Sequence, residues 1–166
     1  MPFRIDAKKK IFLATTADMS YAFAIRENGV PVNLHWGGRI DRLDDLTDES
    51  EISWFRISHY CGRAKSSRLE FPAYVPRHYY EPCLKLSSPD RALELMYESH
   101  RLENENHLIV TLREPGCGLV VNLHYELFPE FDLIQRHAEL INEGNAEIRV
   151  ENLFSAAWNL PRGEAP

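Results

Sequence analysis

The chain lacks the short motifs that mark most enzyme active sites. It has no glycine-rich phosphate loop, which argues against a nucleotide-binding enzyme, and no G-x-S-x-G sequence of a serine hydrolase. No histidine pair has the H-E-x-x-H spacing of a zinc hydrolase, although a hairpin could bring His124 and His137 face to face. Acidic residues are too common for one pair to stand out as the two carboxylates of a glycosidase. We therefore predict no catalytic residue, no metal site and no cofactor.

Cysteine is scarce and widely spaced. Cys61, Cys83 and Cys117 are odd in number and form no C-x-x-C motif, which fits neither a disulfide framework nor a zinc site. We expect them to be small buried residues in a reducing compartment. The sequence has no N-x-S/T acceptor, and its apolar run at 11–14 is too short for a signal peptide or a membrane span. The prediction is a cytoplasmic protein without membrane association.

Positive charge is in short supply. The formal net charge is −6 over 166 residues, and no basic stripe is visible, so nucleic acid is not expected as a partner. Acidic residues gather at 41–51, but this segment lacks the ligand spacing and central glycine of a calcium loop. We interpret it as a solvated loop. The chain length suits one domain that buries about 70% of its unfolded surface.

Helical periodicity is almost absent, and strand alternation takes its place. Leu119, Val121, Leu123, Tyr125 and Leu127 alternate with polar residues, as in a half-buried strand. The pattern predicts four consecutive strands at 107–113, 119–127, 132–141 and 146–158, and earlier ones at 10–15, 21–25, 30–36, 52–60, 81–86 and 92–102. A long antiparallel run needs a second layer to cover its apolar face. The predicted fold class is all-β, an antiparallel β-sandwich.

Aromatic residues next to charged ones give the best signal for a ligand. Trp36 precedes Gly37-Gly38, and a proline-flanked loop at 74–80 holds three tyrosines and a histidine. Trp54 and Trp158 lie near predicted strand ends. Exposed rings beside arginine and carboxylate groups suit the apolar face and the hydroxyls of a sugar. Core packing is the favoured alternative for Trp54 and Trp158.

Several blocks of sequence resemble one known family. They are Thr15-Thr16 with Ser20-Tyr21-Ala22-Phe23, Trp36-Gly37-Gly38-Arg39-Ile40, Glu81-Pro82-Cys83-Leu84, Tyr97-Glu98-Ser99-His100-Arg101, Pro129-Glu130-Phe131-Asp132-Leu133-Ile134-Gln135-Arg136, and Ser155-Ala156-Ala157-Trp158 running into Leu160-Pro161-Arg162-Gly163. In this order they resemble the amino-terminal β-sandwich domain of glycoside hydrolase family 36, the bacterial α-galactosidases.

The resemblance implies a β-supersandwich of the galactose-mutarotase type, placed before a (β/α)₈ barrel. The barrel would carry the nucleophilic aspartate of a Lys-x-Asp pattern and a second, acid/base aspartate. This sequence has no Lys-x-Asp and no room for a barrel of about 250 residues. We therefore expect residues 1–166 to be a single, incomplete, non-catalytic amino-terminal domain. The implied parent hydrolyses terminal α-galactosides with retention and assembles as a homo-oligomer.

The resemblance also suggests site residues. Many family members carry Gly-Asp-Phe-Arg before Glu-Pro, on a loop that reaches a neighbouring subunit's active site. Here the aligned residues are Arg77-His78-Tyr79-Tyr80, so the Asp and Arg that would contact sugar hydroxyls are missing. His78 and Tyr80 can still donate hydrogen bonds, and with Trp36 and Arg39 they form the candidate rim of a sugar site. A stand-alone carbohydrate-binding or interaction module and a mutarotase-like sugar enzyme remain alternatives, because fold alone does not choose among them.

Overall fold

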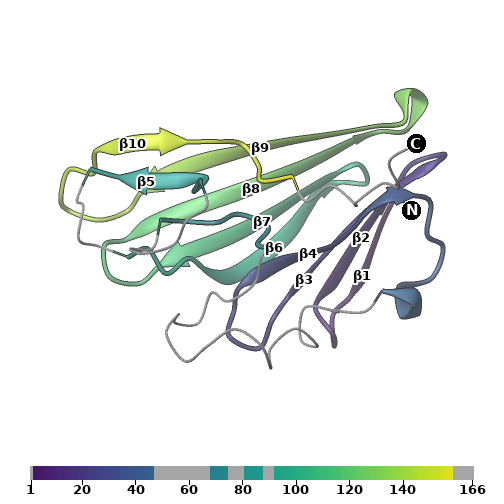
Figure 1. The fold of residues 1–166 in the computed structure, drawn as a ribbon, viewed down its shortest axis with the longest axis horizontal. Helices are drawn as coiled ribbons and strands as arrows, with labels where there is room; N and C mark the ends of the chain where they lie inside the picture. Colours follow the sequence, from purple (N-terminus) through teal and green to yellow (C-terminus); the bar gives the residue numbers. More distant parts are fainter. Residues whose placement is uncertain (1, 47–67, 75–80, 88–91, 159–166) are drawn as a thin grey trace.

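Two antiparallel sheets form the body of the molecule. The computed structural model describes residues 2–46, 68–74, 81–87 and 92–158. One four-stranded sheet has the order β1-β2-β3-β4 and the other the order β6-β7-β8-β9, and a two-stranded sheet of β5 and β10 lies at one end (Figure 1). Side chains of both large sheets share one apolar core, so the predicted all-β antiparallel sandwich is confirmed.

The first sheet is built from successive hairpins. Its strands are β1 (Phe3–Asp6), β2 (Ile11–Thr15), β3 (Met19–Ile25) and β4 (Pro31–Gly38). The Asn28-Gly29 turn joins β3 to β4 as predicted, with Gly29 at φ +80°, a conformation that glycine adopts without steric cost. Strand β1 was not predicted, and β4 continues through both glycines expected to end it.

The central strands of this sheet are buried on both faces. Phe12, Tyr21 and Phe23 face the second sheet. On the opposite face Leu13 belongs to a smaller apolar cluster, which Leu46, beside the short helix η1 (Leu43–Asp45), and Leu69 complete. Because both faces are covered, these strands read as continuous apolar runs rather than as alternating ones.

The second sheet contains β6 (Met96–Asn104), β7 (His107–Glu114), β8 (Leu119–Phe128) and β9 (Leu133–Asn142). A short helix, η3 (Pro129–Phe131), turns β8 into β9, and the pair stays in register from Leu119↔Asn142 to Phe128↔Leu133. The five alternating apolar residues of β8 all lie in the core. The predicted hairpin contact of His124 with His137 is also present.

The last predicted strand differs from expectation. Only Val150–Leu153 of the segment 146–158 forms a strand, β10, and it pairs with β5 (Leu84–Leu86) instead of continuing the meander beside β9. The chain changes direction where Gly144 packs closely against the β7–β8 turn, leaving no space for a Cβ atom beside the carbonyl of Cys117. The strand predicted at 52–60 lies outside the described residues.

Candidate functional site

Two tryptophans meet at the edge of the core. Trp36 on β4 donates its indole Nε1–H to Met19 Sδ at 3.3 Å, and its ring lies 4.7 Å from that of Trp158. Trp36 is half-buried, whereas 45% of Trp158 is exposed. Core packing was the favoured interpretation of Trp158, and that expectation is wrong, because the ring covers the core with one face and meets solvent with the rest. The pair forms an aromatic surface at the edge of the core.

A buried ion pair lies beneath this aromatic surface. Arg136 Nη2 lies 2.7 Å from Glu70 Oε1, and Arg136 Nη1 donates to the Tyr21 hydroxyl at 2.9 Å. Glu70 accepts hydrogen bonds from the hydroxyls of Tyr21 (2.7 Å) and Tyr125 (2.9 Å). The guanidinium also lies 5.2 Å from the ring of Trp158, in cation–π range. One cluster thus joins both sheets to the segment 68–74.

Tyr21, Tyr125, Arg136 and Cys83 of this cluster all have raised pKa values. Burial and then the Glu70 carboxylate raise the pKa of Tyr21 and of Tyr125 well above the usual range, which keeps both phenols neutral. Burial by itself lowers the pKa of Arg136, but Glu70, Tyr125, Tyr21 and Cys83 together outweigh it and the pKa stays above its usual value. Burial raises the pKa of the nearby Cys83 thiol to about 11. None of the four exchanges a proton near neutral pH, so the cluster holds structure together and does no acid/base chemistry.

This cluster was missed from sequence because its members are far apart along the chain. Glu70 is 66 residues from Arg136, and Tyr21 is 115 residues from it. One signal was present: Arg136 occupies an inward position of β9, between Ile134 and Ala138, which both pack against the core. A charge on the apolar face of a strand implies a buried partner.

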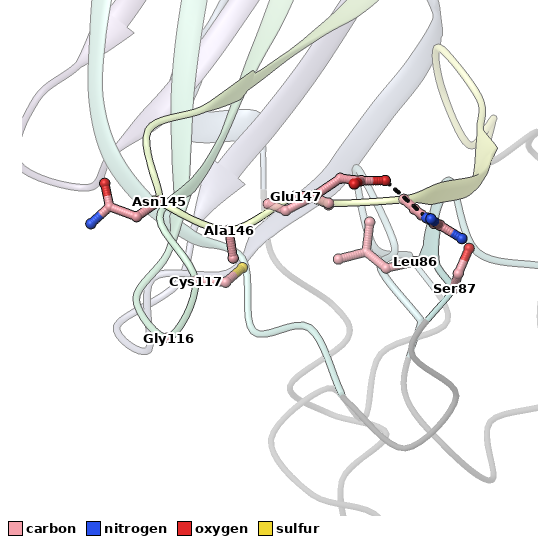
Figure 2. A pocket seen from close by; sticks show the side chains of 9 residues that line it. Leu86, Ser87, Gly116, Cys117, Asn145, Ala146 and Glu147 are labelled. Carbon is pink, nitrogen blue, oxygen red and sulfur yellow. Dashed lines mark hydrogen bonds and ion pairs between the residues drawn. The ribbon is translucent and has the colours of Figure 1, made fainter.

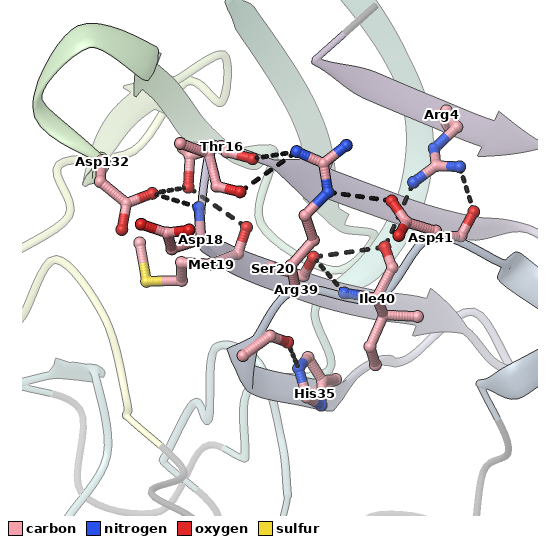
Figure 3. A network of polar contacts seen from close by, with 12 residues as sticks. Arg4, Thr16, Asp18, Met19, Ser20, His35, Arg39, Ile40, Asp41 and Asp132 are labelled. Atoms are coloured by element: carbon pink, nitrogen blue, oxygen red, sulfur yellow. Dashed lines mark hydrogen bonds and ion pairs between the residues drawn. The ribbon is translucent and has the colours of Figure 1, made fainter.

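Arg39 belongs to a separate network at the end of the first sheet (Figure 3). Its Nε–H donates to Asp41 Oδ1 at 2.9 Å, and its Nη1 donates to the carbonyls of Thr16 and Ala17 at 3.0 and 3.2 Å. Arg4 donates to the carbonyls of Ile40 and Asp41 beside it. The guanidinium of Arg39 is therefore fixed by the turn between β2 and β3.

Asp132 closes the same network from the second sheet. It follows η3 in the left-handed conformation, at φ +50°, and accepts hydrogen bonds from the Thr16 hydroxyl and from the backbone N–H of Asp18. These two hydrogen bonds lower the pKa of the Asp132 carboxyl. The tip of the β8–β9 hairpin is thereby attached to the β2–β3 turn.

A pocket of about 430 Å³ opens beside Arg39. Its lining residues are Pro2, Arg4, Thr15, Arg39, Asp41 and Pro129. Trp36, the other described rim candidate, is not among them, so the structure places the two side chains in different environments. His78 and Tyr80 lie outside the described residues.

A larger pocket, of about 700 Å³, lies between β5, the β7–β8 turn and the segment 145–149 (Figure 2). This is the end of the molecule that carries the two-stranded sheet of β5 and β10 (Figure 1). Leu86, Cys117 and Ile148 contribute to its lining, and Glu147 and Arg149 pair with each other at 2.9 Å. Glu147 and Arg149 thus form an ion pair with each other at this pocket.

Three histidines line up across β7, β8 and β9. His107 Nε2 and His124 Nδ1 are 3.0 Å apart, and the rings of His124 and His137 stack at 4.2 Å. Within the described ranges, no group of three or more His, Cys, Asp or Glu residues is arranged to hold a metal ion. The same part of the chain has no helix long and apolar enough to cross a membrane.

Comparisons with known proteins agree with this architecture. The model of the glycosyl hydrolase family 36 N-terminal domain matches residues 29–165. A probable α-galactosidase G of Emericella nidulans is 35% identical over 92% of this chain, and a probable α-galactosidase C of Aspergillus flavus is 27% identical over 95%. This chain spans only 23% of the length of each relative.

Solved structures show the same fold. The GH36 α-galactosidase AgaB from Geobacillus stearothermophilus superposes with a TM-score of 0.76 at 19% identity, over 94% of this chain and 24% of its own. An α-galactosidase from Lactobacillus brevis gives 0.77 at 19% identity, over 92% and 24%. With the family model matched over most of its length, this chain belongs to the glycosyl hydrolase family 36 N-terminal domain family.

Proposed function

We propose that this chain is the amino-terminal, non-catalytic part of an α-galactosidase that hydrolyses terminal α-galactosides with retention. The observation that carries the proposal is the family match over residues 29–165, combined with relatives named as α-galactosidases that are about four times as long. Retaining hydrolysis needs two carboxylates about 5 Å apart on either side of the glycosidic bond. The nucleophile pattern Lys-x-Asp is absent from this sequence, and the proposal places those carboxylates on a barrel outside residues 1–166.

In this proposal residues 1–166 supply scaffold, subunit contacts and the rim of the sugar site. The Glu70–Arg136 ion pair holds the two sheets together, and the sheets carry the residues at the rim of the sugar site. The rim residues are Trp36 and Arg39, joined by His78 and Tyr80. The parent is a cytoplasmic homo-oligomer whose partner is an α-galactoside sugar.

The test compares this chain with the full-length protein that contains it, on a chromogenic α-galactoside. We expect hydrolysis by the full-length protein, with the α-anomer of galactose released first as seen by NMR, and none by the 166-residue chain. Turnover by the chain that survives further purification would contradict the non-catalytic role. A full-length protein that is inactive on every α-galactoside would contradict the parent reaction and favour a carbohydrate-binding module.

A further inference from the structure

The pocket beside Arg39 has the features of a binding site of its own. Its volume of about 430 Å³ falls within the range of roughly 300–1,000 Å³ that is usual for small-molecule sites. It lies on the outer face of the first sheet, because Arg4 is opposite Leu13 in the β1–β2 register and Thr15 is two residues further along β2. Thr15 and Arg4 therefore share this face, and both line the pocket.

Thr15, one of the lining residues, has a buried and unsatisfied hydroxyl beside this pocket. The residue is only 9% exposed, and its Oγ1 has no hydrogen-bond partner among the described residues. A comparable residue of the second sheet, Thr111, is 8% exposed but donates to Asn122 Oδ1 at 2.9 Å. Most buried hydroxyls are satisfied, and an unsatisfied one needs an explanation. Because Thr15 Oγ1 makes no hydrogen bond, a χ1 rotation that brought it to the pocket would break none.

Arg39 and Asp41 can each form a further hydrogen bond in the pocket. Arg39 uses Nε and Nη1, and Asp41 uses Oδ1, whereas Arg39 Nη2 and Asp41 Oδ2 make no hydrogen bond within the described ranges. Arg4 is held in place by two backbone carbonyls. The pocket thus offers a fixed donor beside a fixed acceptor, each able to form one more bond.

This combination of donor and acceptor suits the hydroxyls of a sugar. A guanidinium and a carboxylate side by side can donate to one hydroxyl and accept from its neighbour. The rings of Pro2 and Pro129 provide apolar walls for the C–H face of a pyranose. A phosphate would be attracted by Arg4 and Arg39 and repelled by the Asp41 carboxylate, which is paired with Arg39, so phosphate is the competing ligand to test. We propose that the pocket binds one pyranose unit, with Arg39, Asp41 and Thr15 contacting its hydroxyls. The choice of galactose for this unit rests on the proposed function.

The test follows the arginine side-chain N–H signals of the 166-residue chain by NMR while methyl α-galactoside is added, at a concentration at which light scattering finds the chain monomeric. We expect the Arg39 signal to shift and saturate. Thr15→Val keeps the shape of the side chain, so it should bind about threefold to tenfold more weakly. Its melting temperature should stay level or rise, because it loses an unsatisfied hydroxyl. Asp41→Asn, a change at an exposed side chain, should weaken binding without affecting folding.

Thr111→Val is the matched control, since it removes a satisfied hydroxyl from the other sheet. It should lower the melting temperature and leave sugar binding unchanged. Inorganic phosphate serves as the competing probe. The proposal is overturned if no sugar shifts Arg39, if only phosphate does, or if Thr15→Val and Asp41→Asn bind like the wild type. Hydrolysis by the full-length protein is a separate measurement, so a failure of the parent reaction and a failure of this pocket are distinguishable.

Discussion

At the scale of single residues, the most consequential pair is Glu70 with Arg136. Both side chains are almost fully buried, so the two charges have lost their hydration and depend on each other and on two tyrosine hydroxyls. A buried ion pair adds little net stability compared with apolar residues of the same size, but removing one partner is costly because the other charge stays buried. We therefore expect the pair to fix one arrangement of the sheets more than it adds to stability.

Glu70→Leu should lower the free energy of unfolding by about 3–5 kcal/mol, because it leaves the Arg136 guanidinium buried without a counter-charge. Urea unfolding at neutral pH measures the change. The double variant Glu70→Leu/Arg136→Met should recover most of the loss, since it removes both charges. If Glu70→Leu alone unfolds at the wild-type urea concentration, the pair does not constrain the fold.

The two described cysteines should differ in reactivity. Burial raises the pKa of Cys83 to about 11, so at pH 8 almost none of this cysteine is the nucleophilic thiolate. Cys117 is only half-buried and lines the pocket of Figure 2. Iodoacetamide at pH 8 should therefore modify Cys117 well before Cys83, as read by peptide mass spectrometry. Equal rates would mean that Cys83 is as accessible to the reagent as Cys117, which would contradict its burial.

At the scale of elements, a strand could be located from the sequence when its apolar and polar residues alternate over enough positions. β8 and β9 have ten residues each, which is long enough for the alternation of their side chains to locate them closely. β10 has four residues and β5 three, too few for a period, and their pairing is set by contacts such as the Phe154 N–H to the Cys83 carbonyl. Arg39 was singled out by its motif, but the pocket around it depends on Pro129, which is 90 residues away in the chain.

The histidine row on β7, β8 and β9 should make stability depend on pH. Burial, followed by repulsion from His137 and His107, lowers the pKa of His124, although Glu139 partly opposes this. The unfolded chain therefore binds a proton more readily than the folded one, so stability is lost as pH falls through about 6.5, the unfolded value. His124→Gln should flatten the rise of unfolding free energy between pH 5.5 and 7.5. An unchanged slope would assign that dependence to other groups.

At the scale of the whole molecule, the described surface carries several large apolar side chains. Phe131 is 74% exposed at the hairpin tip, and Leu133 beside it is 49% exposed. Phe154 and Trp158, at 47% and 45%, follow β10. Exposed apolar groups of this kind favour association with another surface. They are consistent with the subunit and interdomain contacts proposed for the parent.

The isolated chain should therefore bind a hydrophobic dye and self-associate as its concentration rises. Dye fluorescence and light scattering at several concentrations measure both. The double variant Phe131→Ser/Leu133→Ser should reduce both signals, because it removes the apolar surface at the hairpin tip. A monomer that binds no dye would show that these side chains are shielded in solution.

The wide sequence separation of the Glu70 cluster also has a kinetic consequence. Its hydrogen bonds join residues 49, 66 and 115 positions apart, so no local segment can form it alone. Non-local pairing in all-β proteins is slow, because loop-closure entropy is lost before the contacts form. Hairpins such as β8–β9 should be protected from hydrogen exchange early in refolding, and the ion pair should be excluded from water last. The step that fixes the two sheets against each other would then limit the rate at which this domain matures.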